Sequence, residues 1–286
     1  MQIFDMHAHW ATKRGYLFQT EAELAQQEVT FRSKPRYRTE QEMADDLAAH
    51  GIRVILDFGF TKSMSAEAAA EVHDYGFDVQ RKYPEMVLGH WIHAQPGPAN
   101  TWLKEFRRCL DKGRELGFVG LNVQGSGGPP ASDISWDPFY RLCIEANVPA
   151  LIYVGTTGLG AGLPGGNGIE LDNCHPRHVD QVAARYPELR ILAGRPAWPW
   201  QSEMIAILLH KPNVWYELHG WSPKYWSAEL KHEIPRRLKD RVMFGSDYPL
   251  FSYDRLLSDW RALSFDQSIL DKVMKENAVR FLREME

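Results

Sequence analysis

Short apolar runs, many of them rich in β-branched residues, alternate with longer amphipathic stretches along the whole chain. Runs that are apolar on both faces are typical of strands in a parallel sheet that helices cover on both sides. Strands are predicted at residues 3–9, 52–60, 85–93, 118–124, 148–155, 190–194, 214–219 and 241–247. Helices are predicted between them at residues 40–51, 65–83, 102–117, 136–147, 175–189 and 200–211.

Eight strand–helix repeats without an internal linker predict a single (β/α)8 TIM barrel that spans residues 1–286. A doubly wound open sheet is the alternative, but no GxGxxG motif follows the first strand. Two segments exceed the minimal barrel: the polar and aromatic insertion 11–38 after the first strand, and the glycine-rich loop 155–168 after the fifth. Both follow strands on the face where barrel enzymes build their sites. The loop is either a flexible connector or a segment that passes close to a ligand.

Two histidines and a late aspartate are the strongest candidates for chemistry. Side chains alternate along a strand, so His7 and His9 point to the same face and can bind one cation together. Asp247 ends the last predicted strand, which lies beside the first once the barrel closes. Asp247 alone could instead cap the next helix. The combination predicts a metal site formed by His7, His9 and Asp247.

The composition excludes several classes of protein. The chain of 286 residues is 44% hydrophobic and 24% charged, as in globular proteins, and its net charge of −4 argues against nucleic-acid binding. Cys109, Cys143 and Cys174 are too widely spaced for a disulfide framework or a cysteine zinc site. No apolar run is long enough for a membrane span and no signal peptide is recognised, so a cytoplasmic location without membrane association is expected.

Several blocks of the sequence resemble the amidohydrolase superfamily, in particular the amidohydrolase-related branch that includes aminocarboxymuconate-semialdehyde decarboxylase. The blocks are DMHAHW, CHPRHVDQVAARYPELRILAG, PAWPWQSE, NVWYELHGWSPKYW, RVMFGSDYPL and ENAVRFL. The resemblance implies a barrel with one divalent ion, usually zinc or manganese. It also implies that the two HxH histidines, a histidine after strand five and the aspartate after strand eight bind this ion, and that a histidine after strand six acts as acid or base.

Two of the five implied site residues are replaced in this chain. His7, His9 and Asp247 match, but Tyr153 stands where the ligand histidine is expected, and Arg195 stands where the catalytic histidine is expected. The phenol of tyrosine has a pKa of about 10, so it is a poor ligand while it is neutral. Arginine does not transfer protons near neutral pH, but its guanidinium can hold a carboxylate or an oxyanion. Arg195 is therefore interpreted as an anion clamp, with a structural arginine as the alternative.

Three arrangements are compatible with these replacements. In the first, His7, His9 and Asp247 still bind one metal ion, with water or Tyr153 completing the coordination. In the second the metal is absent, Asp247 acts as the general base, and Arg195 and Tyr153 stabilise an oxyanion. In the third the chain is an inactive paralogue that serves as a subunit or binding protein.

Further polar residues at strand ends are candidate substrate contacts. Glu217 and His219 share one face after strand seven, where His219 could also replace the missing acid or base. Asn122 and Gln124 could bind substrate oxygens or form hydrogen bonds inside the barrel. The remaining candidates are His93 after strand three, His175 before a helix, and Trp198 in an aromatic rim.

The leading hypothesis is a hydrolase that acts on an aromatic or unsaturated carboxylic substrate, namely a lactone, a thioester or an activated C–C bond. A metal-dependent decarboxylase of the same branch is the alternative within the family. A small anionic molecule is the expected partner, and the resemblance implies a homodimer.

Overall fold

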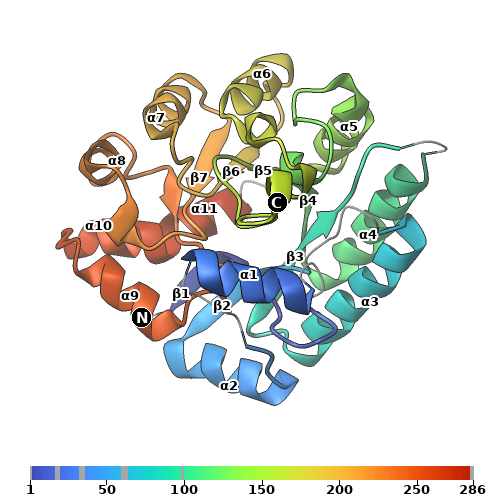
Figure 1. Ribbon diagram of the computed structural model, residues 1–286, viewed down its shortest axis with the longest axis horizontal. Coiled ribbons are helices and arrows are strands. Elements are labelled where there is room, and N and C mark those ends of the chain that lie inside the picture. Colours follow the sequence, from blue (N-terminus) through green and yellow to red (C-terminus); the bar gives the residue numbers. More distant parts are fainter. Residues whose placement is uncertain (1, 17–19, 32–35, 59–63, 98–99, 284–286) are drawn as a thin grey trace.

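The computed structural model describes residues 2–16, 20–31, 36–58, 64–97 and 100–283. Its centre is an eight-stranded parallel sheet whose strands follow one another in chain order. The strands are β1 (Ile3–Ala8), β2 (Ile52–Asp57), β3 (Val87–His93), β4 (Phe118–Val123), β5 (Ala150–Tyr153), β6 (Ile191–Gly194), β7 (Val214–Glu217) and β8 (Val242–Met243). Helices surround the sheet (Figure 1), which confirms the predicted (β/α)8 barrel.

Backbone hydrogen bonds after β8 close the barrel onto β1. The amide of Met6 donates to the carbonyl of Phe244 at 3.0 Å, and the amide of Asp247 donates to the carbonyl of His7 at 2.9 Å. The last predicted strand extends to residue 247, but β8 ends at Met243 because the chain then leaves the extended conformation. Asp247 itself has a φ of 58°. This turn carries its carboxylate over the end of β1.

The predicted helices are all present, and their ends follow the usual capping rules. Before the second helix, Thr39 and Glu42 form a reciprocal capping box, and Gly51 ends that helix with a φ of 64°. The α-helices are α1 (Glu21–Phe31), α2 (Glu40–His50), α3 (Ala66–Lys82), α4 (Thr101–Leu116), α5 (Asp137–Ala146), α6 (Arg177–Arg185), α7 (Gln201–His210), α8 (Ala228–Glu233), α9 (Tyr253–Arg261), α10 (Gln267–Asp271) and α11 (Asn277–Arg283). Short helical turns are η2 (Gly125–Gly127), η3 (Ile134–Trp136), η4 (Pro164–Gly168), η5 (Leu171–Cys174), η6 (Pro223–Tyr225) and the π-helical η7 (Lys272–Glu276).

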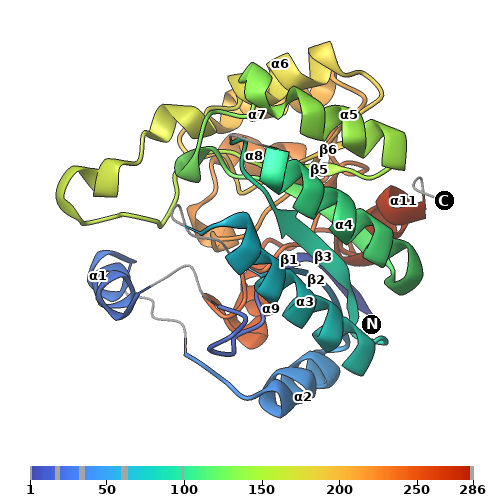
Figure 2. The ribbon, with the colours of Figure 1, turned by 90° about the vertical axis from the view of Figure 1, so that its right-hand side faces the viewer.

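The core has two layers, one inside the barrel and one between strands and helices. Phe4, Trp91 and Trp215 fill the interior, and Phe281 of α11 packs with them. In the side view α11 lies at the end of the barrel opposite α1 (Figure 2). Apolar residues therefore seal one end of the barrel, and polar chemistry is left to the other end.

The two extra segments meet over the open end of the barrel. The insertion 11–38 contains α1, which stands apart from the other helices in Figure 2, on the same side as the glycine-rich loop. A Cβ atom at Gly162 in that loop would come within 2.3 Å of Gln26 Nε2 and 2.5 Å of Thr30 Oγ1 on α1. Residues 17–19 and 32–35 of the insertion, like residues 59 and 60 of the second predicted strand, lie outside the described part.

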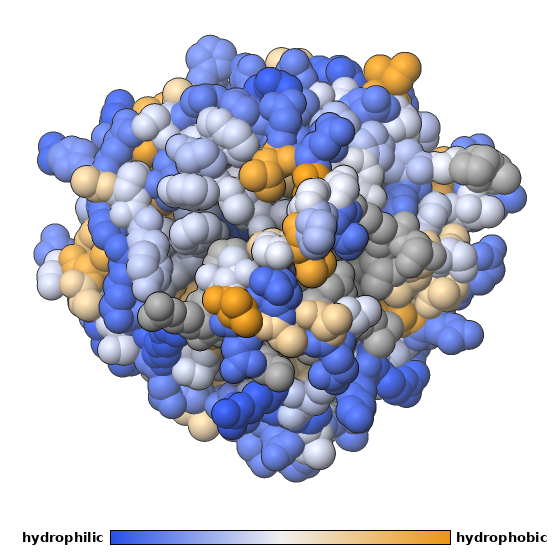
Figure 3. Space-filling model, in the orientation of Figure 1, coloured by the Kyte–Doolittle hydropathy of each residue, from blue (hydrophilic) through white to orange (hydrophobic). Residues whose placement is uncertain are grey.

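The face that carries this opening is mostly hydrophilic, with small apolar patches towards its centre (Figure 3). Val29 on α1 is 75% exposed, and Leu171 after the glycine-rich loop is 45% exposed. Among the described helices, none combines the length and the apolar character that crossing a bilayer would require.

Candidate active site

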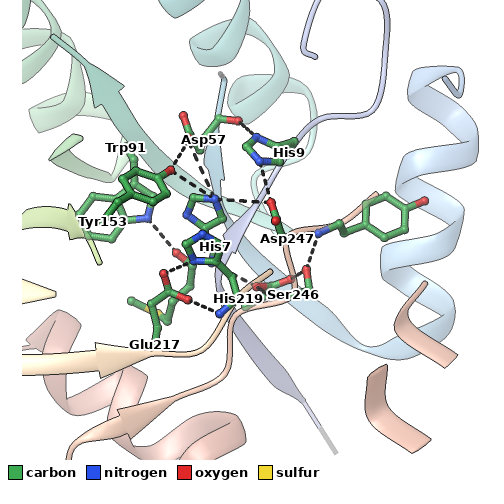
Figure 4. A network of polar contacts seen from close by, with 12 residues as sticks. His7, His9, Asp57, Trp91, Tyr153, Glu217, His219, Ser246 and Asp247 are labelled. Atoms are coloured by element: carbon green, nitrogen blue, oxygen red, sulfur yellow. Dashed lines mark hydrogen bonds and ion pairs between the residues drawn. The ribbon is translucent and has the colours of Figure 1, made fainter. Parts of the chain in front are cut away.

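His7, His9 and Asp247 converge at the open end of the barrel (Figure 4). His9 Nε2 lies 3.0 Å from Asp247 Oδ1, and His7 Nε2 lies 3.9 Å from the same oxygen. The candidate ligand atoms of these three residues all lie within 4.8 Å of one another. The structure thus brings together the three residues that the sequence predicts as a metal site. We call them the mouth cluster.

A buried carboxylate behind the mouth cluster holds β1 and the chain after β8 together. Asp5 Oδ1 accepts hydrogen bonds from the amides of His7 at 3.1 Å and Ser246 at 3.0 Å, and Tyr253 donates to Asp5 Oδ2 at 2.9 Å. Burial raises the pKa of Asp5 to about 7, against the effect of its hydrogen bonds. The ladder between β1 and β2 shifts between Asp5 and Ala8, so His7 faces the barrel opening after Met6 has faced the interior.

Burial, hydrogen bonds and neighbouring charges set the protonation of the mouth cluster. Burial, together with the neighbouring His219, His9 and Arg195, holds the pKa of His7 well below 6.5, so this imidazole is neutral. Burial works against the charged form of His9, but the hydrogen bond to Asp247 and the charge of Asp57 raise the pKa of His9. Burial of Asp247 is likewise outweighed, mainly by the hydrogen bond with His9, and its pKa falls to about 2. Asp247 is therefore a carboxylate at any physiological pH.

Tyr153 belongs to a hydrogen-bonded group beside the mouth cluster. Its hydroxyl donates to Asp57 Oδ2 at 2.6 Å, accepts from Asn122 Nδ2 at 3.3 Å, and lies 3.5 Å from His7 Nε2. Burial and the charge of Asp57 raise the pKa of Tyr153 well above 10. Tyr153 is therefore a neutral phenol here, and its proton is committed to Asp57.

His219 and Glu217 form a second ionisable pair at the end of β7. Glu217 Oε1 lies 2.5 Å from His219 Nδ1, and Glu217 Oε2 accepts the backbone amide of His219 at 2.9 Å. The ring of His219 stacks on that of His7, with centroids 3.8 Å apart. Space for the Glu217 carboxylate depends on Gly194 and Gly245, where a Cβ would lie 2.7 Å and 2.1 Å from its two oxygens.

Arg195 follows β6 with a φ of 76°, and its guanidinium lies over the ring of Tyr153, 4.5 Å from the centroid. Its Nη1 atom is buried and has no hydrogen-bond partner among the described residues. A buried donor without a partner is costly unless something accepts from it. The position fits an anion that enters from the opening.

These groups lie in or around a cavity of about 340 Å³. That volume lies in the range of small-molecule sites. The mouth cluster, Arg195 and His219 line it, and so do Tyr16 of the insertion and Thr156, Thr157, Gly158 and Leu159 of the glycine-rich loop. Both extra segments thus form walls of the cavity.

Four residues predicted as substrate contacts lie outside the described lining of this cavity. His93 is buried against the ring of Trp102. Asn122 points at the hydroxyl of Tyr153 instead of the opening. His175 packs on Trp200 and lies 3.3 Å from Glu203, and Trp198 is 46% exposed and lies against Trp221. In this structure their side chains support neighbouring segments.

Several lining residues were missed from the sequence, among them Asp57, Tyr16 and Arg255. Asp57 ends an apolar strand, and a carboxylate in such a run was a usable signal. Tyr16 packs its ring edge against His9, and Arg255 reaches the cavity from α9. Nothing in their local sequence distinguishes these two from other surface residues, because the packing of distant segments puts them there.

The fold resembles those of solved structures over almost the whole chain. An uncharacterised TIM-barrel protein of Bordetella bronchiseptica aligns with a TM-score of 0.77 at 17% identity, covering 100% of this chain and 99% of that one. A dihydroxybenzoic acid decarboxylase of Polaromonas sp. JS666, solved with bound manganese and the inhibitor 2-nitroresorcinol, aligns with a TM-score of 0.72 at 16% identity, covering 99% and 97%. The class is therefore a TIM barrel of the kind found in these proteins.

The family follows from the sequence itself. The family model described as amidohydrolase matches residues 4–283, so the chain belongs to the amidohydrolase family, as its sequence blocks suggest. A curated relative, the 2-keto-4-carboxy-3-hexenedioate hydratase of Sphingobium sp. (strain NBRC 103272 / SYK-6), is 35% identical over 80 residues. That match spans 25% of this chain and 23% of the hydratase.

Proposed function

We propose that this protein is a metal-dependent hydrolase that acts on an aromatic or unsaturated carboxylic substrate, with a lactone, a thioester or an activated C–C bond as the reacting group. The observation that carries the proposal is the convergence of His7, His9 and Asp247 on one cavity of about 340 Å³. Two imidazoles and a carboxylate on one side of an ion leave its other positions open for water and substrate.

The mouth cluster fits a divalent ion on its own donor chemistry. His9 Nδ1 lies 2.7 Å from the backbone oxygen of Asp57, which fixes the ring and leaves Nε2 directed at Asp247. Such outer hydrogen bonds are typical of metal-bound histidines. His7 is neutral and Asp247 is ionised, as ligands must be. His7, His9 and Asp247 would hold the ion, and manganese or zinc bound there would polarise a carbonyl and acidify water.

His219 is the proposed general acid or base, and Glu217 positions it. Because Glu217 accepts from Nδ1, the Nε2 atom of His219 is the one left for a proton transfer in the cavity. A carboxylate on one ring nitrogen sets the tautomer and the orientation of the ring. This pair would supply the acid or base function that Arg195, at the end of β6, cannot supply.

Arg195 is the proposed clamp for the substrate carboxylate. Its unpartnered Nη1 atom and its place on the cavity wall support this role. A guanidinium binds a carboxylate with two parallel hydrogen bonds and so fixes its orientation. Tyr153 is less suited to stabilise an oxyanion, because its proton already goes to Asp57.

A second candidate is the addition of water to a C=C bond, which the similarity to a hydratase favours. Hydration and hydrolysis need the same activated water, so the site alone is compatible with both. Decarboxylation, the reaction named for the Polaromonas protein, is the third.

The three reactions differ in their products, which a single assay can read. Purified protein with one equivalent of Mn²⁺ or Zn²⁺ is incubated in H₂¹⁸O with lactones, aryl β-keto thioesters, unsaturated carboxylates and dihydroxybenzoates. Hydrolysis of a thioester or an activated C–C bond gives two fragments, one with ¹⁸O, and hydrolysis of a lactone gives one hydroxy acid with ¹⁸O in its carboxylate. Hydration gives one product with ¹⁸O in a new hydroxyl group, and decarboxylation gives CO₂ and an organic product without label. Labelled carboxylates are expected. Turnover that is fully retained in chelator-stripped protein would contradict the metal-dependent mechanism.

A further inference from the structure

We propose that the cavity contains two separate anion subsites, an inner one at Arg195 and an outer one at Arg255, and that the substrate therefore carries two carboxylates. The inner subsite rests on the proposed function. The outer subsite extends it to a substrate class, because it selects dicarboxylates over monocarboxylates.

The inner subsite consists of polar atoms that have no hydrogen-bond partner in the described structure. They belong to residues that follow three neighbouring strands. Gln124 follows β4, Thr156 follows β5 and Arg195 follows β6, and all three line the cavity. Gln124 Oε1, Thr156 Oγ1 and Arg195 Nη1 are buried without hydrogen-bond partners in the described structure. A carboxylate would accept from Arg195 and Thr156, and half a turn of the Gln124 amide would add its NH₂ group as a third donor.

The outer subsite is the guanidinium of Arg255, whose Nε atom faces a carboxylate on the same helix. Arg255 lies on α9, lines the cavity, and has its Nε 4.0 Å from Asp259 Oδ2. Asp259 is already bound by Lys224 Nζ at 2.8 Å and by Ser222 Oγ at 2.7 Å. One carboxylate is thus shared among several donors, and the charge of Arg255 is only partly compensated. The Arg255 guanidinium also lies 5.1 Å from the ring centroid of Phe251.

The two guanidiniums line different parts of one cavity. Arg195 follows β6, whereas Arg255 lies on α9 after β8, two strands further round the barrel. The mouth cluster lies beside Arg195, because a Cβ atom at Gly220 would come within 3.1 Å of Asp247 Oδ2 and 4.0 Å of Arg195 Cγ. A ligand whose first carboxylate binds Arg195 would therefore lie next to the reacting centre, and its second carboxylate would extend along the cavity to Arg255.

Charge balance favours such a ligand over a monoanion. Arg195 and Arg255 are the permanent cations among the described residues that line the cavity. Asp57 and Asp247 line it as well, and a divalent ion bound to the mouth cluster would offset these two carboxylates. A monocarboxylate on Arg195 leaves Arg255 unmatched. The side chain of Arg255 is 48% exposed, so solvent weakens its attraction and the expected gain is about tenfold in affinity.

The test compares matched ligands on the intact protein. Saturated α,ω-dicarboxylates from succinate to suberate, and straight-chain monocarboxylates of the same lengths, are titrated by calorimetry into the Mn²⁺-loaded protein. At least one dicarboxylate is expected to bind about tenfold more tightly than its matched monocarboxylate. Arg255→Met should remove this advantage and leave monocarboxylate binding within about twofold, whereas Arg255→Lys should keep part of it.

Arg261→Met is the control, because Arg261 is exposed on the same helix and lies outside the described lining. The proposal is overturned if no dicarboxylate has an advantage, or if the advantage survives in Arg255→Met or disappears equally in Arg261→Met. Arg195→Met separates the two ideas: it should weaken both ligand classes. If it weakens neither while Arg255→Met removes the dicarboxylate advantage, the clamp at Arg195 is wrong and the outer subsite stands.

Discussion

Among the described residues, two separate places in the barrel have the donor groups of a metal site, but only one is open to a ligand. At the open one, His7 also forms such a group with Glu217 and His219. The mouth cluster of His7, His9 and Asp247 lines the cavity. The second, which we call the flank cluster, consists of His73 on α3 and Glu105 and Cys109 on α4. Its members are buried between helices and are absent from the described lining of the cavity.

The flank cluster already has its counter-ion. Arg108 Nε and Nη2 each lie 2.7 Å from an oxygen of Glu105, and His73 Nδ1 lies 2.8 Å from Glu105 Oε1. Burial and the charge of Glu105 raise the pKa of the Cys109 thiol, so the thiol keeps its proton. Residue type and proximity are therefore insufficient for a metal site. Access from the cavity makes the difference.

Asp247→Asn should disrupt the mouth cluster and cause the largest loss of activity. Loss of the charge removes a ligand and should lower kcat/KM by about a thousandfold or more. The fold should persist, because asparagine tolerates a positive φ. Steady-state rates on the substrate found in the labelled-water assay, together with thermal melting, measure both effects. Asp254→Asn, at an exposed position on α9, is the matched control. Wild-type activity in Asp247→Asn would refute the assignment.

Metal-binding measurements should show directly which of the two clusters binds the ion. Protein stripped with a chelator and reloaded should bind about one equivalent of Mn²⁺ or Zn²⁺, with the content read by elemental analysis. His9→Ala should weaken binding by about a hundredfold, since it removes a ligand from a site of three. His73→Ala should bind like the wild type. The reverse pattern would place the ion in the flank cluster.

The barrel could be predicted from the sequence because hydrophobic periodicity and the residues that begin and end helices are local signals. The apolar runs specify the strands, and features such as Thr39 with Glu42 specify where helices begin. The mouth cluster could be predicted in outline, since strand alternation puts His7 and His9 on one face and closure of the barrel brings the end of β8 beside β1. The register shift in β1 and the turn at Asp247, which complete the geometry, were not predicted. Helix α1 inside the insertion 11–38 was not predicted, because its pattern of apolar and polar residues is weak.

The rest of the site depends on distant packing that local patterns do not carry. Asn122 ends an apolar run, where a substrate contact is expected, but its amide donates a hydrogen bond to the hydroxyl of Tyr153 on the next strand. Arg255 looks like an ordinary surface residue until the fold brings α9 to the cavity. The sequence alone does not show which of His73 and His7 lines a cavity. The flank cluster forms and becomes buried only when α3 and α4 pack and bring His73 to Glu105.

Glu217→Gln should have a smaller effect on catalysis than Asp247→Asn. Glutamine keeps the shape, but its NH₂ group can face Nδ1 and select the other tautomer of His219, so kcat should fall about tenfold to a hundredfold. KM should stay within about twofold, because Glu217 has no access to the substrate. Glu233→Gln, a carboxylate paired with Arg237 away from the cavity, should leave both constants unchanged. Equal losses in KM and kcat would indicate a collapsed site.

Glu105→Gln should affect stability alone, and in a pH-dependent way. Burial opposes ionisation of Glu105, but hydrogen bonds from Arg108 and His73 outweigh it and lower its pKa to about 2 from 4.5. A depressed carboxyl pKa contributes stability that is complete above the unfolded pKa and is lost as the pH falls towards the folded pKa. Urea unfolding at pH 7 should show a loss of about 2 kcal/mol in Glu105→Gln, with kcat unchanged.

The pH dependence of this loss in unfolding free energy distinguishes an ion pair at Glu105 from packing that does not depend on charge. Between pH 4.5 and about 2 the wild type should lose this advantage, so the two unfolding free energies should converge as the pH falls from 5 to 3. Glu145→Gln removes an exposed carboxylate 4.0 Å from Arg107 and should cost less than about 0.5 kcal/mol at any pH. A gap for Glu105→Gln that stays constant with pH would mean that shape, and not charge, holds α3 to α4.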